Sequence, residues 1–199
     1  MLGMTIVQQM KCQKEVMFFN RLITTKEQRA TKDYHILYGN LFEEELDEME
    51  TKGILKGDVV EFLDGYADVF VVSIQLCEVT NDPGYIVAIC NDAVLEGQSK
   101  FSEYEFDFYG AVMNVCQSNL TKVPKLDEVL DVYGHHDLPG ALDAASEWIE
   151  ENRGYGEVTY EIIIDSFGQD RVLFKDKNKK LMKWVGFEDP SLDQFISLA

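Results

Sequence analysis

The chain has 199 residues and a formal net charge of −18, from 18 Lys and Arg against 36 Asp and Glu. Hydrophobic residues make up 46% of it, with 12 Phe, 9 Tyr and 2 Trp, which is typical of a folded protein and excludes intrinsic disorder. The surplus of negative charge predicts that nucleic acid is not a partner, because its phosphates would be repelled. The length favours a single domain over residues 1–199.

Cysteine usage and the apolar runs predict the compartment. The chain contains four cysteines: Cys12, Cys77, Cys90 and Cys116. None has C-x-x-C spacing, so we interpret them as buried or incidental thiols, which fits a reducing cytoplasm. The first residues lack the basic segment and apolar run of a signal peptide, and the apolar run at 69–77 is too short to span a bilayer. We therefore expect a cytoplasmic, soluble protein without a membrane partner.

Helical periodicity covers the first part of the chain. Apolar residues recur at three- and four-residue spacings over 5–22, 26–50 and 58–79, and the same pattern favours helices over 85–95 and 104–116. Gly57 followed by Asp58, with Glu61 three residues on, predicts a capping box at the start of the third helix.

The later part of the chain is more mixed. Residues 124–140 are polar, predict a short helix plus a loop, and are typical of an insertion; another short helix is expected over 141–152. Alternating Ile and Val favour a strand over 157–164, and the lysine-rich segment 175–180 has the composition of a hairpin turn. We therefore predict a mainly α fold, an antiparallel helical bundle, with a small C-terminal β-hairpin within about 157–184.

Two acidic stripes stand out on consecutive predicted helices. The first consists of Glu44, Glu45 and Glu48, and the second of Glu61, Asp64 and Asp68. The short connection between the helices favours antiparallel contact, which would aim the stripes at each other. Like charges so arranged need a cation, and all-oxygen ligands suit Mg²⁺ or Mn²⁺. The stripes predict a metal site.

Three segments resemble one known family. EELDE at 44–48 and EFLDGYAD at 61–68 are similar to the E-E-x-x-E and E/D-x-x-D motifs of the all-α nucleoside triphosphate pyrophosphohydrolases, the MazG-like and phosphoribosyl-ATP pyrophosphohydrolase-like proteins. Farther on, SNLTK at 118–122 resembles that group's S-N-x-[ST]-K signature, and KDKNKKLMK at 175–183 resembles its D-x-x-G-K-x-x-K segment. The motifs follow the family's order. Lys179 replaces the usual Gly, and Trp184 stands where Pro is common.

The resemblance implies an Mg²⁺-dependent enzyme that cleaves a nucleoside or deoxynucleoside triphosphate between the α and β phosphates, giving the monophosphate and pyrophosphate. It also implies a homodimer or homotetramer. The metal ligands expected from it are Glu45, Glu48, Asp64, Asp68 and Glu61, where Glu61 has a competing role as a capping residue. Glu44 or Glu45 would act as the general base. The residues expected to bind substrate are Asn119, Lys122, Lys180 and Lys183.

Two other classes of function fit parts of the sequence. A non-catalytic acidic helical module that binds a partner protein would carry its carboxylates spread over the exterior, since acidic helix faces are usually solvated. A di-iron carboxylate bundle needs Glu-x-x-His pairs on two helices, and His35, His135 and His136 supply none. Adjacent His135 and His136 would also point in different directions from a regular helix or strand.

Overall fold

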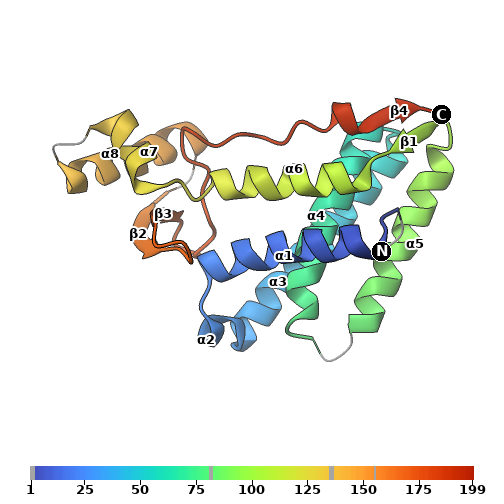
Figure 1. Ribbon diagram of the computed structural model, residues 1–199, viewed down its shortest axis with the longest axis horizontal. Coiled ribbons are helices and arrows are strands. Elements are labelled where there is room, and N and C mark those ends of the chain that lie inside the picture. Colours follow the sequence, from blue (N-terminus) through green and yellow to red (C-terminus); the bar gives the residue numbers. More distant parts are fainter. Residues whose placement is uncertain (1–2, 81–82, 135–136, 155) are drawn as a thin grey trace. The chain divides into compact units, whose positions relative to one another are not determined.

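The computed structural model describes residues 3–80, 83–134, 137–154 and 156–199, and it is mainly helical with small antiparallel sheets (Figure 1). Its contacts divide the chain into two compact units. The first consists of Met1–Cys116 and Pro190–Ala199, and the second of Gln117–Asp189. Compact units are defined by contacts and not by independent folding, so the single domain expected from the sequence stays a prediction.

Helices build most of the first unit. They are α1 (Ile6–Ile23), α2 (Lys26–Arg29), α3 (Lys32–Glu48), the π-helical segment η1 (Met49–Leu55), α4 (Val59–Cys77), α5 (Pro83–Lys100) and α6 (Phe108–Thr121), whose last residues belong to the second unit. Asp58 caps α4, because its Oδ1 accepts hydrogen bonds from the backbone N–H groups of Val60 and Glu61. The predicted capping box is only half formed, since the N–H of Asp58 donates to the carbonyl of Gly53 and not to the Glu61 side chain. None of the described helices is long and apolar enough to cross a membrane.

Helix α4 forms the centre of the first unit. It packs against α1, α3, α5 and η1, as Figure 1 also shows. Apolar residues surround it on nearly all sides, and Phe62, Leu63, Tyr66 and Phe70 are each 2% exposed or less. A helix that is apolar all round has to be enclosed by its neighbours. Two of its polar side chains, Ser73 and Gln75, are buried at 2% and 4% exposure, whereas its charged residues Glu61, Asp64 and Asp68 are exposed or half-buried.

One predicted helix begins later than the sequence indicated. Residues 104–116 were expected to be helical, but Tyr104–Phe106 form strand β1, which pairs antiparallel with β4 (Ile196–Leu198). Tyr104 and Phe106 both pack on the core, which matches the two-residue period of a strand. Asp107 then accepts a hydrogen bond from the N–H of Gly110, and α6 starts. The 3₁₀ turn η2 (Asp193–Phe195) precedes β4.

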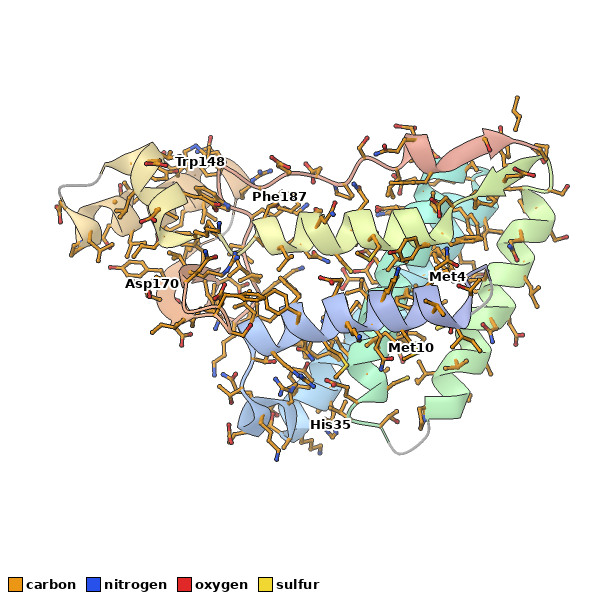
Figure 2. The ribbon with its side chains drawn as sticks, viewed as in Figure 1. Met4, Met10, His35, Trp148, Asp170 and Phe187 are labelled. Carbon is orange, nitrogen blue, oxygen red and sulfur yellow. The ribbon has the colours of Figure 1, made fainter. Side chains whose placement is uncertain are left out.

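The second unit packs two helices on a β-hairpin. Its further elements are α7 (Leu126–Tyr133), α8 (Leu138–Arg153), β2 (Thr159–Ile164) and β3 (Asp170–Lys175). The strands pair antiparallel from Thr159 with Lys175 to Ile164 with Asp170, so the hairpin lies one strand earlier than the lysine-rich turn suggested. Leu181 adds only an isolated bridge to Lys175. Trp148 and Phe187, labelled in Figure 2, belong to the apolar core of this unit.

Candidate functional site: an acidic helix pair and a lysine cluster

Burial separates the acidic residues of α3 and α4 into two groups. Four of the carboxylates are half-buried: Glu45, Glu48, Asp64 and Asp68. Glu44 and Glu61 are exposed. The Oδ1 atom of Asp64 is buried from solvent. The four half-buried residues are the expected metal ligands other than Glu61. Asp64 and Asp68 lie beside the core because their helix, α4, is enclosed by its neighbours.

The glycines of this region show that the two acidic segments run antiparallel. A Cβ atom placed on Gly65 would lie 2.5 Å from Cβ of Met49, and one placed on Gly53 would lie 2.6 Å from Cα of Phe62. Moving forward from Met49 to Gly53 thus means moving backward along α4, from Gly65 to Phe62. The absence of a side chain at both glycines lets the backbones approach closely. The acidic segments therefore belong to one tightly packed pair.

Lys52 supplies positive charge to this helix pair. Its Nζ lies 2.6 Å from Oε2 of Glu48, one helical turn earlier, and both side chains are more than 40% exposed, at 44% and 43%. The hydrogen bond with Glu48, together with the fields of Glu48, Glu61 and Glu45, raises the pKa of Lys52 above its usual value. The ammonium group thus interacts electrostatically with carboxylates of both helices, Glu45 and Glu48 on α3 and Glu61 on α4.

The carboxylates match a hard divalent cation by chemistry but do not form a ligand cage. An all-oxygen donor set is what Mg²⁺ and Mn²⁺ prefer. Among the described residues, however, no three His, Cys, Asp or Glu side chains lie close enough together to hold a metal ion. The cation that the structure places beside Glu48 is the Lys52 ammonium.

A second group of predicted residues meets in the second unit around Phe187; we call Asn119, Lys122, Lys183 and Phe187 the lysine cluster. Nζ of Lys122 donates to Oδ1 of Asn119 at 2.5 Å and lies 5.6 Å from the centroid of the Phe187 ring. Nζ of Lys183 lies 4.3 Å from the same centroid and 3.2 Å from Oδ1 of Asp189. Two segments far apart in sequence are thus joined at one aromatic ring.

Hydroxyl groups of the SNLTK segment hold the chain beside Phe187. Ser118 Oγ donates to the carbonyl of Glu188 at 2.7 Å, and the N–H of Glu188 donates to Thr121 Oγ1 at 3.0 Å. Trp184 Nε1 donates to the carbonyl of Thr121 at 2.7 Å. We call the two hydrogen bonds between these hydroxyl groups and Glu188 the hydroxyl clamp. Ser118 and Thr121 thus position the segment, while Lys122 lies over Phe187 and contacts Asn119.

Lys180 belongs to a tight turn and not to the lysine cluster. Oδ1 of Asp176 accepts hydrogen bonds from the backbone N–H groups of Asn178 and Lys180, at 2.9 and 2.8 Å. The turn requires a positive φ of 66° at Lys179, the position where the resembling family has Gly. Within the described residues, the exposed Lys180 side chain is not among those that contact Phe187.

Sequence reasoning missed two residues of these sites. Lys52 follows Glu48 by four residues, a spacing that favours an ion pair on a helix and that was available as a signal. Phe187 lies beyond the last matched motif, and no local pattern distinguishes it from other core aromatics. His35, labelled in Figure 2, is exposed on α3, and His135 and His136 lie outside the described residues.

Comparison of the chain with protein-family models, with curated proteins and with solved structures finds no match. The resemblance to the all-α nucleoside triphosphate pyrophosphohydrolases therefore rests on the three motifs alone. What the structure adds is the local setting of each motif: half-buried carboxylates for the first, and the lysine cluster for parts of the other two.

Proposed function

We propose that this protein is an Mg²⁺-dependent nucleotide pyrophosphohydrolase of the all-α type, which cleaves a nucleoside or deoxynucleoside triphosphate between the α and β phosphates. The observation that carries the proposal is the half-burial of Glu45, Glu48, Asp64 and Asp68 on an antiparallel helix pair. Carboxylates beside a core are costly to desolvate, so four half-buried ones on one helix pair call for a functional reason.

Each group of residues has a distinct part in this proposal. Glu45, Glu48, Asp64 and Asp68 would hold Mg²⁺, or Mn²⁺ in its place, with Glu61 as an outer, exposed carboxylate. Bound Mg²⁺ supplies positive charge against the phosphates and acidifies the attacking water. Glu44, exposed at the start of the motif, or Glu45 would accept the proton of that water.

The second unit would supply the nucleotide contacts. Lys122 and Lys183 carry compact ammonium charges suited to phosphate oxygens, and the Asn119 amide can hydrogen-bond a base or a sugar. Lys180, in the turn after Asp176, would meet phosphate only as an exposed charge.

A screen of nucleoside triphosphates with Mg²⁺, scored by release of pyrophosphate, tests the proposal. The expected result is stoichiometric monophosphate and pyrophosphate from at least one nucleotide, and loss of that activity in Asp68→Asn. Glu43→Gln is the control, because Glu43 is an exposed carboxylate on α3, the helix of the first acidic motif, and lies outside that motif. Release of orthophosphate instead, or equal activity in Asp68→Asn, contradicts the proposal.

A second candidate is a non-catalytic acidic module that binds a partner protein. The observation in its favour is that no metal-binding group of three side chains exists among the described residues, together with the net charge of −18. This candidate expects no pyrophosphate release with any nucleotide and no calorimetric signal on addition of Mg²⁺. The same screen therefore separates the two functions.

We also propose a homodimer or homotetramer, as the family resemblance implies. Exposed apolar side chains on α1 support it: Ile6, Val7 and Met10 are 76%, 63% and 55% exposed. Such a row on one helix is typical of an interface between subunits. Light scattering across micromolar to millimolar concentrations is expected to report at least a dimer, and a monomer throughout contradicts this proposal.

A further inference from the structure

Phe187 brings two like charges to one place. The residue is 9% exposed, and Nζ of Lys122 and Nζ of Lys183 lie 5.6 and 4.3 Å from the centroid of its ring. An aromatic ring attracts cations through its negative face, so one ring offsets part of the repulsion between the two ammonium groups. We propose that Phe187 is a positioning residue that gathers Lys122 and Lys183 into one binding site for a polyphosphate anion.

The backbone around the ring is fixed by the motif that also carries one of the lysines. The hydroxyl clamp bonds Glu188, the residue after Phe187, on both its carbonyl and its N–H side, through Ser118 and Thr121. These bonds therefore hold the backbone next to Phe187 beside the segment that carries Lys122. Lysine otherwise loses much rotamer freedom when it binds. Contact with the Phe187 ring already restricts the lysine side chains, so less rotamer freedom is lost when an anion binds. In this way Phe187 would raise the affinity for an anion without contacting it through a polar atom.

The polar contacts of the cluster indicate which anions it would take. Lys122 Nζ donates a hydrogen bond to the amide oxygen of Asn119, and Lys183 Nζ lies 3.2 Å from the carboxylate of Asp189, which is 72% exposed. An incoming anion has to compete with that carboxylate for Lys183. A polyphosphate can do so, because its several charges reach both ammonium groups at once, whereas a monoanion gains little. This assignment rests on the proposed function and adds the ring as the element that joins the two lysines.

The test is a calorimetric titration of the full chain with inorganic tripolyphosphate in the presence of EDTA. EDTA removes divalent metal, so the measurement reports the lysine cluster and not the carboxylates. Phe187→Met, which has a similar volume and no ring, is expected to bind about fivefold more weakly. Phe187→Trp is expected to bind at least as tightly as the natural chain, and Asp189→Asn more tightly because the competing carboxylate is gone.

A second substitution separates positioning from packing. Pentafluorophenylalanine at position 187 keeps the shape of the ring and reverses the charge of its face, so it should weaken binding as much as Phe187→Met does. If Phe187→Met fails to fold by circular dichroism, the fluorinated ring decides alone. Unchanged affinity with the fluorinated ring, or no binding of tripolyphosphate by the natural chain, overturns the inference, and the lysine stems then merely cover apolar surface.

Pyrophosphate release from nucleotides with Mg²⁺ is measured beside these titrations. Retained release together with unchanged binding in the ring variants overturns the role of Phe187 alone. Absence of release in the natural chain overturns the proposed function, whatever the ring variants show.

Discussion

The carboxylates of α3 and α4 and the ammonium groups of the lysine cluster are positioned by different kinds of interaction. The carboxylates depend on helix periodicity and on close backbone contact between Met49 and Gly65. The ammonium groups depend on hydrogen bonds that join residues 70 positions apart, such as Ser118 and Glu188. Packing of consecutive helices therefore places one charged group, and contacts between segments far apart in the sequence place the other. Substitutions should affect the two groups separately.

The largest expected effect comes from removing one half-buried carboxylate. Glu48→Gln or Asp68→Asn should lower pyrophosphate release about 100-fold or more and weaken Mg²⁺ binding, because each removes a charge that a divalent cation needs. The fold should persist or gain stability, since repulsion between carboxylates is relieved. Calorimetry with Mg²⁺ beside steady-state kinetics measures both effects.

The Glu48 variant also tests an exposed ion pair. Glu48→Gln removes the ion pair with Lys52, which is exposed and so should contribute only about 0–1 kcal/mol to the free energy of unfolding. If neither substitution changes Mg²⁺ binding or activity, the acidic stripes are a solvated face.

Close packing of the acidic helices is tested by adding a methyl group at Gly65. Gly65→Ala places a Cβ 2.5 Å from that of Met49 and should lower the free energy of unfolding of the first unit by about 1–3 kcal/mol. Gly39→Ala is the matched control: a Cβ at Gly39, in α3, meets nothing within 4 Å, so helix propensity should raise stability by up to about 1 kcal/mol. Chemical denaturation followed by circular dichroism gives both values. Equal effects at the two glycines would mean that the helices are packed more loosely than described.

Removing a single ammonium group from the lysine cluster should leave metal binding unaffected. Lys183→Ala is expected to raise KM for the nucleotide about tenfold with Mg²⁺ affinity nearly unchanged, because an ammonium contacts phosphate and cannot ligate a cation. The measurement is KM and kcat at saturating Mg²⁺. A fall in Mg²⁺ affinity of the same size would break the distinction between the two charged groups.

Lys52 offers a test in the opposite direction. Lys52→Met removes the cation that already interacts with Glu48, Glu45 and Glu61, so Mg²⁺ should bind up to about fivefold more tightly. Titration with Mg²⁺ at low ionic strength is the appropriate measurement, because screening weakens exposed pairs. Weaker Mg²⁺ binding in this variant would show that Lys52 supports the carboxylates instead of competing for them.

The smallest expected effect concerns the turn after Asp176. Lys179 has a φ of 66°, a conformation that side chains with a Cβ rarely adopt. Lys179→Gly should therefore stabilise the second unit by about 1 kcal/mol. Its effect on tripolyphosphate binding should be small, because Lys179 is exposed and outside the lysine cluster. Thermal unfolding followed by tryptophan fluorescence measures the gain.

The sequence predicted those features that depend on a local period. The helices, the Asp58 cap and the apolar surroundings of the acidic stripes all follow from spacings of three and four residues. The strand Tyr104–Phe106 was read as helix, because its partner Ile196–Leu198 lies far along the chain and strand pairing has no local signal. Phe187 was missed for the same reason. The π-helical segment η1 was not expected either, since the sequence suggested only a break there.

The distribution of two residue types across the units has a practical consequence. All four cysteines lie within Met1–Cys116, and both tryptophans, Trp148 and Trp184, lie within Gln117–Asp189. Burial raises the pKa of Cys12 to about 11 and that of Cys116 to about 12, so these thiols react slowly while the first unit is folded. Labelling of the buried thiols Cys12, Cys90 and Cys116 therefore reports unfolding of one unit, whereas Cys77 is half-buried, and indole emission reports unfolding of the other unit. The natural chain thus carries one probe for each unit. Denaturant unfolding curves from thiol labelling and from tryptophan emission coincide if the two units unfold together and differ if they unfold separately.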